Sequence, residues 1–103
     1  MSVKQLTIIY DAAIDESITE LIDGLGLAGY TKLFDAHGLG GTGHKLNSPV
    51  FPGINNLLLL PLPEDSVSTV TDSLYRLQAS YRLKPGMTLI LQDVWIPDRP
   101  RDL

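Results

Sequence analysis

The residues of this chain that are best suited to chemistry are the glycines of one short segment. From His37 to Gly53 the chain reads His-Gly-Leu-Gly-Gly-Thr-Gly-His-Lys-Leu-Asn-Ser-Pro-Val-Phe-Pro-Gly, with neither helical nor strand periodicity. Glycines allow the backbone to approach a ligand closely, and successive amides can then point at an anion. Unstructured loops longer than about 12–15 residues are usually functional or disordered. The segment therefore predicts an anion-binding loop, with a plain flexible surface loop as the alternative.

Three cations elsewhere in the chain are candidate partners for an anionic ligand. Lys84 lies beside a Pro-Gly turn, and Arg99 and Arg101 lie in the charged, proline-containing tail 97–103. Lysine and arginine neutralise phosphates, and arginine can do so with paired hydrogen bonds. The alternative is that all three are solvated surface charges.

His37 and His44, together with Asp35, suggest a metal site, because imidazoles bind transition metals readily. Two histidines seven positions apart on a loop do not form a preorganised site, so no metal site is predicted. A metal-responsive binding protein that uses these histidines stays open as an alternative function.

Catalysis is not predicted. Acidic residues between positions 11 and 23 have a spacing that fits helix capping and a solvated helix face. The chain has no cysteine, and no set of nucleophile, base and orienting residue is visible. We therefore expect no enzyme activity and no catalytic residues.

Hydrophobic periodicity predicts two helices and four strands. The apolar positions of the helices recur every three or four residues, and the strands are rich in β-branched or leucine residues. The predicted strands are residues 3–10, 31–36, 55–62 and 87–96, and the predicted helices are residues 15–25 and 65–81. Pro61 within the third strand predicts a bulge or a position beyond the paired region.

This order of elements predicts an α+β fold of the ferredoxin-like βαββαβ type, an antiparallel sheet with two helices on one face. Leu57 to Leu60 and Leu89 to Leu91 place apolar side chains on both faces of their strands. Since a single copy would expose a large apolar patch, we infer an oligomer joined through the open sheet faces.

Length and composition are those of one ordinary globular domain spanning residues 1–103. The net charge of -4 and the lack of a basic cluster argue against nucleic-acid binding. Neither a signal peptide nor an apolar run long enough for membrane insertion is visible, so a cytoplasmic location is expected.

Four short motifs resemble the P-II signalling proteins, whose layout matches nearly the whole chain. Gly-Tyr-Thr at residues 29–31 resembles the start of the second strand in that family, and residues 37–43 resemble the start of its flexible T-loop. Leu-Pro-Glu-Asp-Ser-Val at 62–67 resembles the entry to its second helix, and Leu-Lys-Pro-Gly-Met at 83–87 resembles its B-loop.

The resemblance implies a homotrimer that binds ATP, ADP or AMP in clefts between subunits and regulates a partner through the T-loop. Bicarbonate is implied as a further effector, and a membrane transporter, for example one for bicarbonate, as the regulated partner. The tail would be adaptable. By position, the implied nucleotide-binding residues are Gly38, Gly40, Gly41 and Thr42 of the T-loop base, Leu62 against the adenine, Lys84, Gly86 and Thr88 of the B-loop, and Arg99 and Arg101 of the tail.

The chain departs from the family pattern at several of these places. Gly41 and Thr42 stand where the family has arginine and glutamine, and Met87 replaces the B-loop lysine that follows the second glycine. The loop is shorter and has no counterpart of the tyrosine that is uridylylated in classical members. The resemblance is therefore to a divergent P-II-like protein. The alternative resembles the trimeric metal-tolerance proteins of the CutA type.

Overall fold

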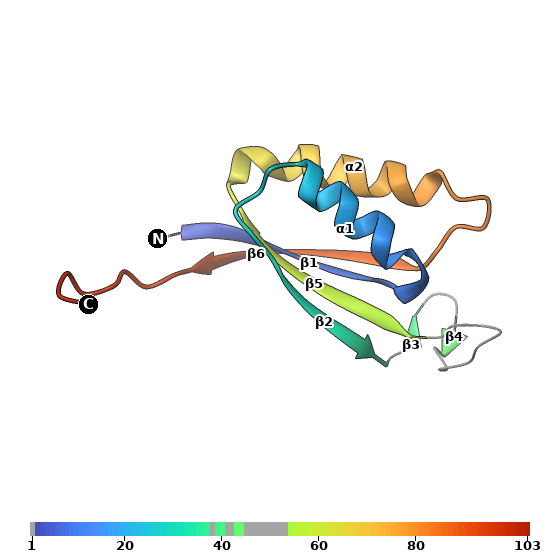
Figure 1. Ribbon diagram of the computed structural model, residues 1–103, viewed down its shortest axis with the longest axis horizontal. Coiled ribbons are helices and arrows are strands. Elements are labelled where there is room, and N and C mark those ends of the chain that lie inside the picture. The colour runs from blue at the N-terminus through green and yellow to red at the C-terminus, as the bar shows by residue number, and fades with distance from the viewer. Residues whose placement is uncertain (1, 38, 41–42, 45–53) are drawn as a thin grey trace.

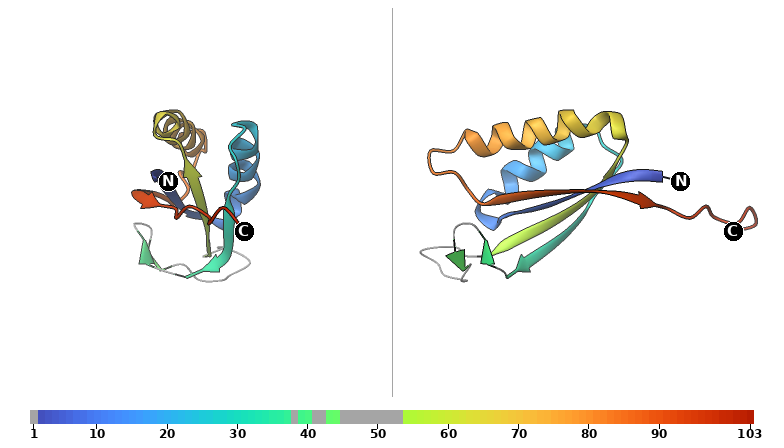
Figure 2. Two further views of the ribbon diagram at one scale, coloured as in Figure 1. Left: turned by 90° about the vertical axis from the view of Figure 1, so that its left-hand side faces the viewer. Right: turned by 180° about the vertical axis from the view of Figure 1, so that it is seen from behind.

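The computed structural model describes residues 2–37, 39–40, 43–44 and 54–103 of the protein. Two helices lie side by side over one face of an antiparallel sheet, whose four long strands are ordered β2-β5-β1-β6 (Figures 1 and 2). This arrangement confirms the predicted ferredoxin-like βαββαβ fold. The elements are β1 (Ser2–Asp11), η1 (Ala12–Ile14), α1 (Asp15–Gly24), β2 (Thr31–Ala36), β3 (Leu39–Gly40), β4 (Gly43–His44), β5 (Asn55–Leu62), η2 (Glu64–Ser66), α2 (Val67–Ala79) and β6 (Met87–Trp95).

The predicted helix over residues 65–81 differs from the structure at both ends. Its first turn is the 3₁₀ turn η2 after Pro63, and α2 ends at Ala79. Tyr81 is therefore outside the helix, although it still packs partly buried against the core. The short pair β3–β4, in which Gly40 is opposite Gly43, lies inside the segment predicted to be a loop.

The core fills the space between the sheet and the helices. Every second residue of β1 and β5 points into this space, as the alternation of a half-buried strand requires. The buried apolar side chains are Leu6, Ile8, Tyr10, Ile14, Ile18, Ile22, Leu58, Leu60, Leu62, Val70 and Leu74.

The opposite face of the sheet is also apolar at its centre. Leu57 of β5 is paired with Ile9 of β1 on one side and with Leu33 of β2 on the other. Leu33 is 50% exposed, and Ile90 of β6 is 42% exposed. The helices do not cover this face (Figure 2). The predicted apolar character of the open face is therefore confirmed.

Pro61 is accommodated without a break in the pairing of β5 with β1, where it is opposite Gln5. The neighbouring strand β2 pairs with β5 only as far as Leu59. Because one side of β5 has no partner beyond Leu59, a residue without an N–H costs no ladder hydrogen bond on that side. The prediction that Pro61 lies beyond the paired region is therefore correct for the pairing with β2 but not for the pairing with β1.

The molecule is elongated, with extents of 53 × 24 × 21 Å. Its radius of gyration of 15.2 Å exceeds the roughly 13 Å typical of a compact chain of this length. The C-terminal segment after β6 extends away from the two layers and ends in a turn, where the Leu103 amide donates to the Pro100 carbonyl (Figure 1).

Candidate functional site

Two loops meet at the end of β1. The name B-loop is used for residues 80–86, which connect α2 to β6. The name T-loop is used for residues 37–53, which include β3 and β4 and are followed by Ile54 and β5. The Asp11 amide donates to the Gly86 carbonyl at 3.0 Å, and the next amide, that of Ala12, donates to the Ile54 carbonyl at 3.0 Å. The neighbouring residues Asp11 and Ala12 therefore hold the end of the B-loop and the end of the T-loop next to each other.

Some of the predicted nucleotide-binding residues lie at this end of the molecule. Lys84 is exposed in the B-loop and directly precedes the Pro85-Gly86 turn. Thr88 is exposed on the open sheet face opposite Ile9. Gly40 is described through its pairing in β3, whereas the predicted residues Gly38, Gly41 and Thr42 lie outside the described part of the chain.

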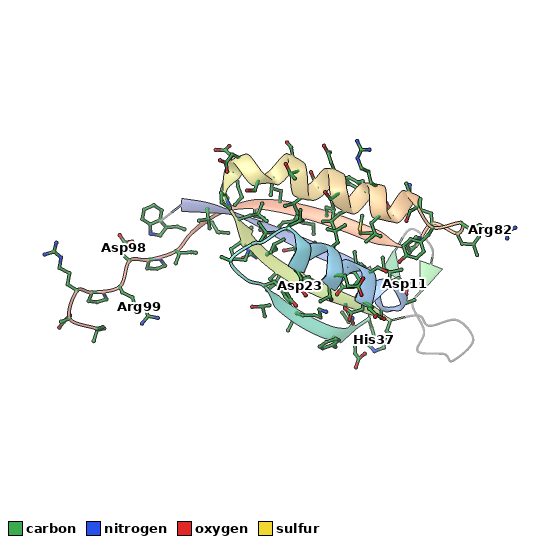
Figure 3. The ribbon with its side chains drawn as sticks, turned by 45° about the horizontal axis from the view of Figure 1, so that its top comes forward. Asp11, Asp23, His37, Arg82, Asp98 and Arg99 are labelled. Atoms are coloured by element: carbon green, nitrogen blue, oxygen red, sulfur yellow. The ribbon has the colours of Figure 1, made fainter. Side chains whose placement is uncertain are left out.

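The predicted tail cations lie at the other end. Arg99 and Arg101 are exposed and follow the last strand. In Figure 3, Arg99 is far from Arg82 of the B-loop, with the body of the domain between them. Since β6 advances about 3.3 Å per residue, its ends are separated by roughly 26 Å. Lys84 and the tail arginines of one chain therefore cannot contact the same phosphate group.

Leu62, the predicted adenine contact, lies at the same end as the tail. The residue is only 2% exposed and belongs to the core beneath the helices. Within one copy, Leu62 therefore presents almost no surface to a ligand. The motif position alone did not reveal this, because the sequence does not show on which face of β5 the residue falls.

The root of the T-loop is shaped by a bulge in β2. Between the pairs Leu33–Leu57 and Ala36–Asn55, strand β2 has two residues opposite the single residue Asn56. Asp35, the second of the two, adopts a φ of 61°, a left-handed conformation that aspartate tolerates better than most residues. A bulge leaves a backbone group unpaired in the ladder, and here the Asn56 Oδ1 accepts the Asp35 amide at 3.3 Å.

Asn56 belongs to a polar cluster under the start of α1. Asp15 accepts hydrogen bonds from the Tyr10 hydroxyl at 2.6 Å and from the Asn56 amide at 3.1 Å. Lys32 lies 2.9 Å from the same carboxylate and also donates to Thr19. Four elements are joined in this way. The sequence predicted a capping or solvated role for Asp15, and the structure shows that it instead accepts hydrogen bonds inside the domain.

The cluster shifts the pKa values of two of its members. Desolvation raises the pKa of Asp15, but the hydrogen bonds from Tyr10, Lys32 and Asn56 outweigh it and lower this pKa below its ordinary value of 3.8. Burial, followed by the hydrogen bond to Asp15, raises the pKa of the Tyr10 hydroxyl far above 10.0. The carboxylate is thus held ionised and the phenol neutral.

Replacing Asp15 by alanine is expected to lower the free energy of unfolding by about 2–3 kcal/mol, because Tyr10 and Lys32 lose their shared acceptor. The depressed pKa makes this contribution full above pH 3.8, and it is lost as the pH falls through the lower folded value. Urea unfolding of both proteins at several pH values measures the difference. Glu16→Ala, on the exposed side of the same helix turn, should change stability by less than about 0.5 kcal/mol. A difference between wild type and Asp15→Ala that stays constant as the pH falls well below 3.8 would contradict this assignment.

Sequence reasoning also missed residues that bear on the candidate site. Arg82 is exposed in the B-loop two positions before Lys84, so this loop presents two cations. Gln78 and Asn56 are buried polar residues. A signal for Gln78 was available, since it occupies the apolar stripe of its helix one turn after Leu74.

Among the described residues, no group of three or more histidine, cysteine, aspartate or glutamate side chains is placed to hold a metal ion. His37 is exposed just after β2.

None of the described helices is long and apolar enough to cross a membrane.

Solved structures of PII-like proteins share this fold. CPII, a nitrogen regulatory PII-like protein from Thiomonas intermedia K12 bound to ADP, AMP and bicarbonate, has a TM-score of 0.75 at 21% identity, covering 94% of this chain and 97% of that one. The chain has the fold of the PII-like proteins. The apo form of CPII has a TM-score of 0.67 at 20% identity, covering 94% of this chain and 96% of CPII. A Thermus thermophilus protein described as a PII-like signalling protein has a TM-score of 0.65 at 23% identity, covering 93% and 90% of the two chains.

No protein-family model matches the chain, and no curated protein matches it. The similarity to the PII-like structures is therefore carried by the fold rather than by the overall sequence.

Proposed function

We propose that the protein is a divergent PII-like regulatory protein that binds ADP, ATP or AMP between subunits. The observation that carries the proposal is the placement of two cationic segments at opposite ends of a fold shared with CPII, whose solved structures contain ADP, AMP and bicarbonate. The proposal includes no catalytic step, and the structural neighbours are described as regulatory and signalling proteins.

The proposed assembly is a homotrimer that buries the open sheet face. Half-buried Leu57 and Leu59 of β5, together with the more exposed Leu33 and Ile90, form the apolar centre of that face. Apolar area of this kind on a monomer typically marks an interaction site. Closed cyclic symmetry lets every copy bury the same face. The number three comes from the P-II resemblance.

Each nucleotide site would combine the two ends of neighbouring copies. One copy would supply Lys84 and Gly86 of the B-loop, Thr88 at the start of β6, and Gly40 with the predicted T-loop residues outside the described part. The neighbour would supply Arg99 and Arg101 and the segment around Leu62. The separation of roughly 26 Å along β6 makes this division necessary if both sets bind one nucleotide.

The proposed output is a change in the T-loop. A charged ligand that contacts a loop can order it, and differential affinity for the two loop states provides the signal. We propose a partner protein in the cytoplasm, such as a transporter, as the receiver of that signal. Bicarbonate is proposed as a second effector, supported by its presence with ADP in CPII structures.

Titration calorimetry with ADP, ATP and AMP, with and without bicarbonate, tests the proposal. We expect saturable binding below millimolar concentration and at least a tenfold loss of affinity in Lys84→Glu, because a charge-assisted contact is replaced by repulsion. Arg76→Glu makes the same change in net charge on the exposed face of α2 and should leave affinity within about twofold. Absence of saturable binding of all three nucleotides at millimolar concentration would overturn the proposal.

A further inference from the structure

Two polar side chains are buried among the described residues of the core. Asn56 is 3% exposed and Gln78 is 8% exposed. A buried amide destabilises a domain unless it is hydrogen-bonded. Apolar side chains of similar size would fill the same positions without needing hydrogen-bond partners. The partners of the Asn56 and Gln78 amides therefore indicate the role of these two residues.

Gln78 holds the B-loop. Its Nε2 donates to the Pro85 carbonyl at 2.8 Å, and the next carbonyl along the chain, that of Gly86, accepts from the Asp11 amide at 3.0 Å. Two successive carbonyl oxygens of the loop are therefore bonded to the body of the domain. Lys84 directly precedes this pair and is exposed, so the held turn sets where its backbone lies.

Asn56 holds the root of the T-loop. Its Oδ1 accepts the amide of Asp35 at the β2 bulge, and its Nδ2 donates to Asp15. The Tyr10 hydroxyl donates to the same carboxylate. The direction in which the chain leaves β2 toward the T-loop thus depends on a side chain that is itself fixed in the core.

We propose that Gln78 and Asn56 are positioning residues of the nucleotide site, Gln78 for the B-loop and Asn56 for the T-loop root. This inference rests on the proposed function above. Gln78 fixes the Pro85 turn of the B-loop and Asn56 fixes the T-loop root at Asp35 before the ligand arrives. Binding therefore does not have to supply the entropy of ordering these two places. Neither residue contacts the nucleotide. Their loss therefore acts on affinity through the loop alone.

The test combines calorimetry with hydrogen exchange in the full chain. Gln78→Met keeps the length and burial of the side chain but removes its donor, and Asn56→Thr removes the amide from a strand position that favours β-branched residues. We expect each variant to bind ADP about tenfold more weakly, as the loss of one buried anchor implies. In the free protein, exchange should accelerate at residues 84–88 in the first variant and at residues 35–37 in the second. Asn56→Ser serves if the threonine variant does not fold.

Val70→Ala is the matched control, because Val70 is 1% exposed on α2 and belongs to the apolar core beneath the helices. It should lower global stability while leaving ADP affinity unchanged. If the wild-type protein binds no nucleotide, the proposed function and this inference are both overturned. If wild type binds ADP and both Gln78→Met and Asn56→Thr bind it with the same affinity, only the positioning role is overturned. Acceleration of exchange throughout the chain, as in the control, would also overturn it.

Discussion

Replacing Leu57 by aspartate is expected to dissociate the assembly into folded single copies. Leu57 lies at the centre of the open sheet face, between Ile9 and Leu33, and not in the core beneath the helices. In a single copy the aspartate stays in contact with water, so the domain still folds. In the assembled protein it would be buried among apolar side chains, at a cost of several kcal/mol per copy.

Sedimentation velocity at micromolar concentration measures the effect. Wild type should sediment as a trimer and Leu57→Asp as a single copy with unchanged circular dichroism. ADP affinity should fall more than about 100-fold, because each proposed site needs two copies. Tyr75→Asp is the matched control, since Tyr75 is 52% exposed on α2, on the helix layer. An aspartate at position 57 that leaves the sedimentation coefficient unchanged would show that this face is not the interface.

The regular elements could be predicted from the sequence because their periodicity is strong. Strand β5 alternates half-buried and buried residues from Asn55 to Leu60, and the apolar stripe of α2 passes through Val70 and Leu74. The helix ends were less predictable. A 3₁₀ turn and an α-helical turn require similar residues, so η2 was not separated from α2.

Apart from Gln78, which lies in the apolar stripe of α2, the polar interior could not be predicted in the same way. Asp15 opens a helix, where acidic residues are common, and nothing in its spacing shows that Tyr10 and Lys32 converge on it. The bulge at Asp35 depends on a mismatch in register between β2 and β5, which no local pattern encodes. These long-range pairings appear only when the strands are placed beside each other.

The candidate site was predicted as a set of residues but not as an arrangement. Lys84 and Arg99 are close in sequence, yet the length of β6 separates them. Their separation changes the interpretation of the whole set, since a ligand that needs both must bind between two copies. The central claim is therefore that the B-loop of one copy and the tail of another bind the same nucleotide.

Mixing two variants with weakened sites tests this claim most directly. Lys84→Glu removes the B-loop cation, and the double variant Arg99→Glu with Arg101→Glu removes the tail cations. Each alone should bind ADP at least tenfold more weakly than wild type. After joint unfolding and refolding at equal concentrations, about one cleft in four should combine an intact B-loop with an intact tail. The account predicts that calorimetry then recovers binding with wild-type affinity at roughly a quarter of the wild-type stoichiometry. Mixed oligomers that form, as shown by capture of a tagged copy, but bind no ADP would contradict it.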